Sequence, residues 1–349
     1  MKRKETRTIR VRGVPIGGGN PIPVQSMTNT HTEDVDATLA QIRRLEEAGC
    51  EIVRLAVPHQ LAARALKDVR KGTDMPLVAD IHFDYKLALA AVEAGFDKIR
   101  INPGNIGSPD RVRAVADACR ERGIPIRIGV NGGSLEKEIL EKYGWSAEGM
   151  CRSALRHVRM LEDCDFHDIA ISLKASDPAL TVEANRRMSE LCDYPLHVGV
   201  TEAGTTELGV LRSAAGIGSL LLDGIGDTIR VSLTDDPVEE VKAGIKLLKA
   251  LELRGGVRFV SCPSCGRTEY DLFGTARKVE ERLKDKDWNI TVAVMGCVVN
   301  GPGEASHADY GIAGGKREGV IFKRGESIGR CPVNELADRL IALIESEHT

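Results

Sequence analysis

The sequence predicts an α/β fold in which a TIM-type (β/α)8 barrel is followed by a small α+β domain. Short apolar runs alternate with amphipathic helical patterns from residue 21 to about 254, as expected for repeated strand–helix units. Eight such units in a span of this length fit a closed barrel. The alternative is an open doubly wound sheet, which is disfavoured because no GxGxxG follows the first run.

The expected strands are apolar runs in which polar residues become frequent toward the end. They lie at 21–28, 51–58, 76–83, 97–104, 124–131, 168–175, 195–202 and 228–235. Helical periodicity between them is clear at 36–49, 87–95, 110–123 and 238–252. The first 22 residues predict a β-hairpin that covers the bottom of the barrel, where the strands begin.

A second domain is expected after the Arg254–Gly256 segment, whose two glycines end the last barrel helix and suggest a hinge. The predicted domains are therefore 1–255 and 256–349. In the second, strand patterns at 258–261, 289–297 and 319–325 alternate with helical patterns at 275–286 and 333–346. This order is typical of a compact α+β domain.

Composition excludes several classes of protein. The 349 residues are 42% hydrophobic and 28% charged, with a net charge of −3, so no overall basic excess favours nucleic acid or an anionic membrane. No apolar run approaches the roughly 18 residues of a membrane span. The basic N-terminus lacks the apolar region of a signal peptide. Nine cysteines do not suggest a disulfide framework, and we expect a cytoplasmic protein.

Basic side chains recur where the expected barrel strands end, which is where barrel enzymes place their active sites. Alternation along a strand puts residues two apart on one face. The sets defined in this way contain Arg54; Asp80 and His82; Arg100 and Asn102; Arg127 and Asn131; Lys174; Arg230 and Ser232. Buried charge needs a partner, and a bound diphosphate would supply one. Alternatively, these cations pair with acidic residues of loops outside the barrel.

Glu202 follows the seventh expected strand in the segment TEAGTTE and is a candidate general acid or base. A solvated loop carboxylate is the simpler interpretation.

The most specific pattern is a pair of cysteines, Cys262 and Cys265, with a third, Cys297, in a glycine-rich segment. Thiolates two residues apart can ligate one metal or cluster, and a third can close the site. A zinc site remains an alternative, although the sequence has no second CxxC and His307 is the only histidine nearby to serve as a fourth ligand. A redox dithiol is another alternative, although it does not explain the third cysteine. The fourth ligand of a cluster could be Cys331, or Glu304 with an oxygen donor.

Long segments throughout the chain resemble the bacterial 4-hydroxy-3-methylbut-2-enyl diphosphate synthases, iron–sulfur enzymes of the methylerythritol phosphate route to isoprenoids. The segments are VQSMTNT, EIVRLAVP, VADIHF, RINPGN, RIGVN, ISLKAS, GVTEAG, GDTIRVSLT, SCPSCGRTEYDL and MGCVVNGPGEA. The chain lacks the central insertion of plant-type members and is therefore similar to the short two-domain form.

The resemblance implies a 4Fe–4S cluster in a sulfite-reductase-like domain, ligated by Cys262, Cys265, Cys297 and Glu304. It implies 2-C-methyl-D-erythritol 2,4-cyclodiphosphate as the substrate, with Glu202 and Asn300 beside the reacting centre. The substrate-binding residues it indicates are Arg54, Asp80, His82, Arg100, Asn102, Arg127, Asn131, Lys174, Arg230 and Ser232. It also implies flavodoxin or ferredoxin as the electron donor, and a head-to-tail homodimer.

A second class of function is a phosphate-binding aldolase or isomerase with a structural zinc domain. The metal distinguishes the two classes. An iron–sulfur synthase should be brown and contain iron and sulfide, whereas an aldolase or isomerase with a zinc domain should be colourless. A non-catalytic binding module fits poorly with so many polar residues at one end of the barrel.

Overall fold

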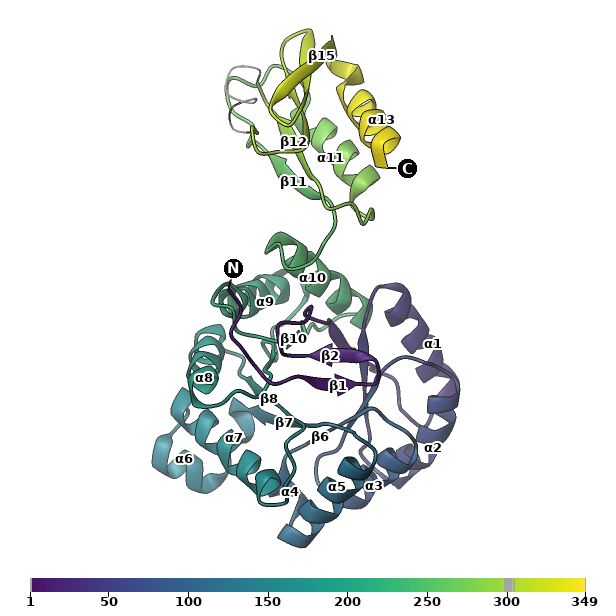
Figure 1. The fold of residues 1–349 in the computed structure, drawn as a ribbon, viewed down its shortest axis with the longest axis vertical. Helices are drawn as coiled ribbons and strands as arrows, with labels where there is room; N and C mark the ends of the chain where they lie inside the picture. Colours follow the sequence, from purple (N-terminus) through teal and green to yellow (C-terminus); the bar gives the residue numbers. More distant parts are fainter. Residues whose placement is uncertain (1, 298–302, 304, 349) are drawn as a thin grey trace. The chain divides into compact units, whose positions relative to one another are not determined.

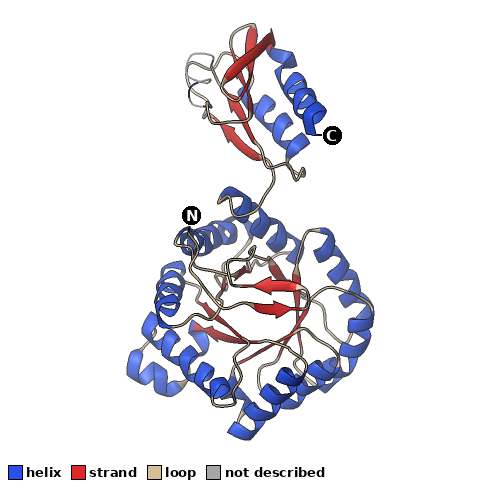
Figure 2. Ribbon diagram, in the orientation of Figure 1, coloured by secondary structure: helices blue, strands red, loops and turns tan. Residues whose placement is uncertain are grey.

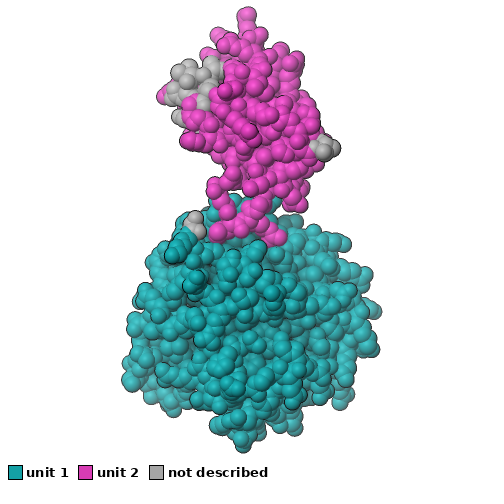
Figure 3. All heavy atoms as spheres, in the orientation of Figure 1, with its two compact units in different colours: residues 1–251 teal, residues 252–349 magenta. Residues whose placement is uncertain are grey.

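The computed structural model describes residues 2–297, 303 and 305–348 and divides the chain into two compact units, 1–251 and 252–349 (Figure 3). The division falls in the loop between helix α10 (Pro237–Ala250) and strand β11 (Arg258–Ser261). The boundary predicted after residue 255 falls in the same loop.

Eight parallel strands form the centre of the first unit (Figure 1). They are β3 (Gln25–Met27), β4 (Ile52–Ala56), β5 (Leu77–Asp80), β6 (Lys98–Ile101), β7 (Ile126–Asn131), β8 (Ile169–Lys174), β9 (His197–Val198) and β10 (Thr228–Ile229). Strands β3 to β8 form one sheet in chain order, and β9 pairs with β10. Single bridges, Ile171 to Leu196 and Val24 to Ile229, join the two sheets. The pairing therefore returns to β3, as expected for a (β/α)8 barrel.

The last two barrel strands are shorter than the sequence predicts. Regular pairing covers two residues in each, although the expected runs were 195–202 and 228–235. Beyond it, the Arg230 N–H still donates to the Val198 carbonyl oxygen at 3.1 Å. The segments then come close, since a Cβ on Gly199 would lie 2.5 Å from the Arg230 carbonyl oxygen. An irregular backbone thus replaces the predicted strand ends.

Helices surround the barrel strands (Figure 2). They are α1 (Val35–Glu47), α2 (Gln60–Lys71), α3 (Tyr85–Glu93), α4 (Pro103–Ile106), α5 (Pro109–Glu121), α6 (Lys137–Tyr143), α7 (Ala147–Glu162), α8 (Pro178–Leu191), α9 (Thr206–Leu222) and α10. Many begin at a residue whose side chain accepts a hydrogen bond from the first helical turn, namely Asp34, Asp84, Ser146, Asp177 and Asp236. These caps fix where each helix starts after its strand.

A hairpin closes the end of the barrel at which the strands begin, as the sequence predicts. Strand β1 (Ile9–Val11) pairs antiparallel with β2 (Val14–Ile16). Its buried apolar side chains pack against the interior residues Ile52, Val78 and Ala170. The opposite end, which we call the barrel mouth, is therefore where a ligand could enter.

The second unit is a five-stranded sheet with two helices on one face (Figure 2). Strands β11, β12 (Thr291–Met295) and β13 (Tyr310–Gly314) are parallel, whereas β14 (Glu318–Lys323) and β15 (Glu326–Pro332) continue the sheet antiparallel. Helices α11 (Leu272–Leu283) and α13 (Leu336–His348) pack on the sheet through one apolar cluster. Within the described residues, no helix combines the length and apolar character that a membrane crossing requires.

Candidate active site

The strand pairings place the inward-facing side chains of the barrel in layers of four, each drawn from alternate strands. From the hairpin toward the mouth, the layers are Ile52, Lys98, Ala170 and Thr228; Gln25, Val78, Arg127 and His197; Arg54, Arg100, Ser172 and Arg230; Met27, Asp80, Gly129 and Gly199; and Ala56, Asn102, Lys174 and Ser232. Branched apolar residues usually fill such layers. In this barrel, four of the five layers contain at least one basic residue.

Asp80 holds two of these cations together. Its Oδ2 lies 3.4 Å from Arg54 Nη2 and its Oδ1 lies 3.2 Å from Arg100 Nη1. Burial by itself would raise the pKa of Asp80, but Arg54 and Arg100 outweigh it and lower the pKa below the usual value. Asp80 is therefore ionised at neutral pH and keeps both guanidinium groups in place.

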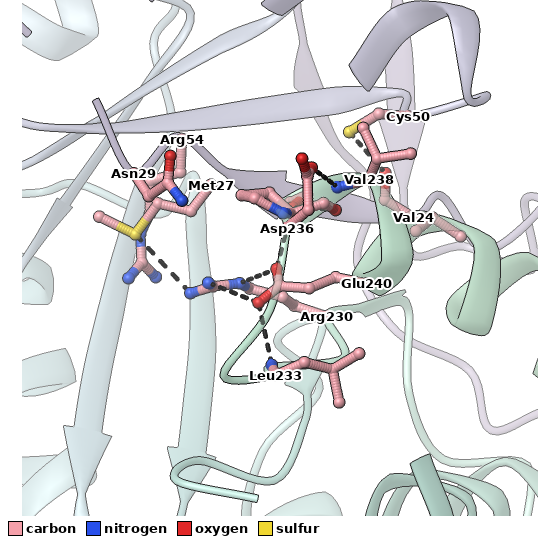
Figure 4. Close-up of polar contacts among 12 residues, drawn as sticks. Val24, Met27, Asn29, Cys50, Arg54, Arg230, Leu233, Asp236, Val238 and Glu240 are labelled. Atoms are coloured by element: carbon pink, nitrogen blue, oxygen red, sulfur yellow. Dashed lines mark hydrogen bonds and ion pairs between the residues drawn. The ribbon is translucent and has the colours of Figure 1, made fainter. Parts of the chain in front are cut away.

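Arg230 is held by Glu240, which reaches the barrel from helix α10 (Figure 4). Arg230 Nε and Nη2 donate to the two carboxylate oxygens of Glu240 at 3.2 and 3.3 Å. The same carboxylate accepts from the backbone N–H of Leu233 at 3.0 Å and from Ser26 Oγ at 2.9 Å. A carboxylate with four donors, itself 3% exposed, is fixed in one orientation and fixes that of Arg230.

The thioether of Met27 separates Arg54 from Arg230 (Figure 4). Arg54 Nε lies 3.1 Å and Arg230 Nη1 lies 3.7 Å from Met27 Sδ. Sulfur is a weak acceptor, so both guanidinium groups keep donor capacity for another ligand. Burial lowers the pKa of Arg54 to about 10, and Asp80 opposes this shift.

Two glycines in the Met27 layer make room for the cations. A Cβ on Gly129 would lie 2.5 Å from Arg100 Nε, and a Cβ on Gly199 would lie 2.8 Å from Lys174 Nζ. Arg100 Nη2 also donates to the Gly129 carbonyl oxygen at 3.0 Å. Glycine at both positions is therefore required by the close approach of long basic side chains rather than by a turn.

The deeper layers contain polar atoms without partners. Arg127 is 1% exposed, and its Nε and Nη1 have no hydrogen-bond partner in the described part of the chain. The same holds for Lys98 Nζ, both amide atoms of Gln25 and His197 Nε2. Burial, together with neighbouring cations, lowers the pKa values of Arg127, Lys98 and Lys174 well below their usual values. This interior is therefore short of negative charge.

The charge balance decides what the barrel can bind. Six basic side chains enter the layers, namely Arg54, Lys98, Arg100, Arg127, Lys174 and Arg230. Within the described residues, two carboxylates form ion pairs with them, Asp80 and Glu240. The alternative of acidic partners outside the barrel applies to Arg230 alone. An anion with several oxygens, entering at the mouth, would supply the missing charge and acceptors.

The other predicted barrel residues lie nearer the mouth. Asn102 Oδ1 accepts from the Gly129 N–H at 3.0 Å, which ties the ends of β6 and β7 together. Asn131 ends β7, and Ser232 is half-buried beyond β10. His82 is exposed, with its ring centroid 6.1 Å from that of Phe83. Glu202 is exposed and has a φ of +52°, an uncommon conformation for a residue with a side chain.

A buried contact supports the loops that carry Asn102 and Asn131. Glu136 Oε1 lies 3.0 Å from His157 Nε2, and Ser153 Oγ donates to Glu136 Oε2 at 2.7 Å. The loop after β6 packs on the same histidine, because a Cβ on Gly104 would lie 2.5 Å from His157 Nε2. Helix α7 thus anchors both loops through one carboxylate–imidazole contact.

In the second unit, two of the predicted cluster ligands follow neighbouring parallel strands. Cys262 follows β11 and Cys297 comes two residues after β12, at the same edge of the sheet. The Gly296 N–H donates to Cys262 Sγ at 3.4 Å. A Cβ on Gly296 would lie 3.1 Å from that sulfur, so the thiol packs against the glycine backbone. Cys265 is exposed, and none of the three cysteines forms a disulfide within the described residues.

These three thiols fit an iron–sulfur or zinc ligand set in type, because soft thiolates at one sheet edge are suited to both. Asn300 and Glu304, also predicted for this site, lie outside the described residues. Cys331 does not follow the parallel strands; it lies on β15, is 3% exposed and belongs to the apolar cluster beneath the helices. Its burial favours a packing role.

Sequence reasoning did not identify four residues of the barrel interior: Gln25, Met27, Lys98 and Glu240. Lys98 could have been predicted, because it precedes Arg100 by two residues and its side chain therefore lies on the same face of the strand. Glu240 carries no such signal, since it lies within a regular amphipathic helix.

The fold and the two groups of residues define a two-domain class of enzyme, in which a (β/α)8 barrel with a cationic interior is joined to a small cysteine-bearing domain. Family comparison agrees with this architecture. Residues 6–245 match the GcpE TIM-barrel domain, and residues 258–346 match the GcpE protein C-terminal domain. The chain belongs to the GcpE family, whose curated members are the 4-hydroxy-3-methylbut-2-en-1-yl diphosphate synthases.

Curated relatives match over almost the whole chain. A 4-hydroxy-3-methylbut-2-en-1-yl diphosphate synthase (flavodoxin) from Symbiobacterium thermophilum is 56% identical, over 99% of this chain and 94% of its own length. Proteins of the same name from Ruminiclostridium cellulolyticum and Geobacter sulfurreducens are each 58% identical, over 98% and 99% of this chain and 97% and 98% of their own lengths.

Solved structures show likeness in fold only. Dihydropteroate synthase from Stenotrophomonas maltophilia aligns with 71% of this chain and 97% of its own, at a TM-score of 0.51 and 16% identity. The N-acetylneuraminic acid synthetase from Leptospira borgpetersenii aligns with 82% and 100%, at a TM-score of 0.51 and 12% identity.

Proposed function

We propose that this enzyme converts 2-C-methyl-D-erythritol 2,4-cyclodiphosphate to 4-hydroxy-3-methylbut-2-enyl diphosphate. The reaction opens the cyclic diphosphate at a carbon–oxygen bond and removes one hydroxyl group. Two electrons and two protons enter, and one water leaves. The observation that carries this proposal is the excess of buried cations below the barrel mouth, which suits a diphosphate. The names of the relatives at 56–58% identity support it.

The barrel residues would bind and orient the substrate. Five basic groups would hold the diphosphate: Arg54, Arg100, Arg127, Lys174 and Arg230. Asp80 and Glu240 keep three of these cations in fixed positions before the substrate arrives, which reduces the cost of ordering them on binding. His82, Asn102, Asn131 and Ser232 are the hydrogen-bonding groups proposed around it. We assign Glu202 and Asn300 to the reacting centre, with Glu202 as the proton donor.

We further propose a 4Fe–4S cluster held by Cys262, Cys265, Cys297 and Glu304 in a sulfite-reductase-like domain. Such a cluster would deliver the electrons singly to the carbon–oxygen bond being broken. The positions of Cys262 and Cys297 after neighbouring parallel strands support this. The Gly296 N–H on Cys262 Sγ supports it too, since hydrogen bonds to cluster sulfurs tune the reduction potential. A flavodoxin or ferredoxin would supply the electrons, as the names of the relatives suggest for flavodoxin.

We also propose a cytoplasmic, head-to-tail homodimer in which the cluster unit of one chain completes the barrel of the other. The odd number of cysteines, which does not suggest a disulfide framework, supports a reducing compartment. The arrangement is tested by mixing Cys297→Ala chains with Arg127→Ala chains, each inactive alone. Activity in the mixed dimer is expected, because one intact site remains. A correctly assembled but inactive mixed dimer would exclude a shared site.

The reaction itself is tested by anaerobic turnover of the cyclodiphosphate with a chemical reductant. We expect product formation by brown protein that contains iron and acid-labile sulfide in near-equal amounts. A colourless protein that holds zinc and does not consume the cyclodiphosphate would favour the aldolase or isomerase class instead.

A further inference from the structure

Lys98 lies in the barrel layer next to the hairpin, below the residues proposed to bind diphosphate. Its side chain is 0% exposed, and its Nζ has no hydrogen-bond partner among the described residues. The other members of its layer are Ile52, Ala170 and Thr228, none of which carries a charge. A buried amine without a partner is costly in its charged form, so its presence calls for an explanation.

The charged and titratable groups around Lys98 come from several strands, and most are basic. Arg127 and Arg54 disfavour the protonated amine, and His197 belongs to the layer above. The one carboxylate among the inward-facing strand residues, Asp80, already contacts Arg54 and Arg100. Glu240 is engaged by Arg230. Lys98 therefore has no acidic partner of its own in the described barrel.

Burial, Arg127 and Arg54 all lower the pKa of Lys98 well below its usual value. Without an anion, this fully buried and unpartnered amine is thus disfavoured in its charged form. An anion placed among the arginines above changes this balance, because it attracts positive charge in a medium of low dielectric constant. The unpartnered Nε and Nη1 of Arg127 lie in the layer between Lys98 and such an anion.

We propose that Lys98 takes up a proton from solvent when a diphosphate group binds in the barrel, and so acts as a positioning residue that stabilises the bound anion from below through Arg127. This inference rests on the diphosphate site of the proposed function. The proton converts the neutral amine to ammonium, and no other bond changes. The interior therefore gains this additional positive charge only when a bound anion is present to offset it.

Isothermal titration with inorganic pyrophosphate tests the proposal on full-length, anaerobically purified protein. Titrations at pH 8 in two buffers of different ionisation enthalpy give the protons taken up on binding. The change in the protonation of pyrophosphate itself is shared by all variants and cancels in the comparison. We expect Lys98→Met to take up fewer protons than the wild type, by up to about one per site. Lys67→Met, at an exposed position of helix α2, should match the wild type.

A second measurement observes the lysine amine of the wild-type protein directly and uses a different variant only for assignment. In wild-type protein labelled with ¹³C at lysine Cε, one resonance should move from the neutral to the charged position when pyrophosphate is added. Lys98→Gln identifies it by its loss. Binding with equal proton uptake in wild type and Lys98→Met, or no such resonance, overturns the role of Lys98 and leaves the diphosphate site standing. Folded wild-type protein that does not bind pyrophosphate contradicts the diphosphate site itself.

Discussion

Glu240 holds the guanidinium of Arg230 through both of its carboxylate oxygens, at 3.2 and 3.3 Å. The two residues come from different parts of the barrel, since Arg230 follows β10 and Glu240 lies in helix α10. Helix α10 therefore determines the orientation of a cation proposed to bind substrate.

Replacing Glu240 with glutamine should destabilise the protein by about 1–3 kcal/mol, because a buried cation loses its charged partner. Saturating pyrophosphate should recover part of this loss, since the anion would replace the missing negative charge. Urea unfolding with and without pyrophosphate measures both effects. Glu239→Gln, at a partly exposed position of the same helix where the carboxylate pairs with Lys242 on the surface, is the matched control and should change stability by less than about 0.5 kcal/mol. Equal destabilisation by the two variants would contradict the role of Glu240.

Gly129→Ala should reduce affinity for pyrophosphate at least about tenfold, or 1.4 kcal/mol. The added Cβ would lie 2.5 Å from Arg100 Nε and 2.8 Å from its Nη2, so Arg100 must leave its position beside Asp80. Equilibrium binding measures the effect. Gly133→Ala serves as the control, because a Cβ there meets nothing within 4 Å. Unchanged affinity in Gly129→Ala would mean that Arg100 does not contribute from this position.

Alternation along the strands explains why much of the barrel interior could be predicted. Arg100 and Asn102 share a face because side chains two apart in a strand must do so, and the structure places them in neighbouring inward-facing positions. Parallel pairing then brings the ends of successive strands to one end of the barrel. Local periodicity and the rules of parallel sheets are sufficient for this part of the arrangement.

The remaining features depend on how different helices and strands pack against one another. Glu240 reaches Arg230 only because of how helix α10 seats on the barrel, and helical periodicity cannot specify that. Gly129 appears unremarkable until Arg100 is placed against it. Cys331 fits a four-cysteine set by residue type, yet the sheet order places it in the apolar cluster of the second unit. Residue type and spacing alone therefore could not show whether Cys331 is a metal ligand or a residue of the apolar core.

Glu136 should make stability depend on pH in the acidic range. Contact with His157 is the main cause that lowers the pKa of Glu136 to about 2; burial opposes it and Ser153 adds to it. Because the folded pKa lies below the unfolded value of about 4.3, the stabilisation is complete above that value and is lost as the pH falls toward 2.

Glu136→Gln should therefore be less stable than the wild type by about 1–2 kcal/mol at pH 7. The difference should shrink steadily from about pH 5 toward pH 2. Chemical unfolding over this range measures it, with Glu138→Gln, an exposed carboxylate on the next helix, as the control. A difference that grows on acidification would have the wrong sign for this explanation.

Cys265→Ser should lose the metal centre, whereas Cys331→Ala should keep it. Cys265 is exposed in the turn after β11, beside the strand ends that carry Cys262 and Cys297, and its substitution removes a thiolate donor. Cys331 is buried on β15, so its substitution leaves a small cavity that costs about 1 kcal/mol of stability without removing a donor. Iron and acid-labile sulfide per chain, measured after anaerobic purification, distinguish the two. Loss of iron in Cys331→Ala together with its retention in Glu304→Ala would identify Cys331 as the fourth ligand. The reason is that a variant that stays folded should lose the metal only when a ligand has been removed.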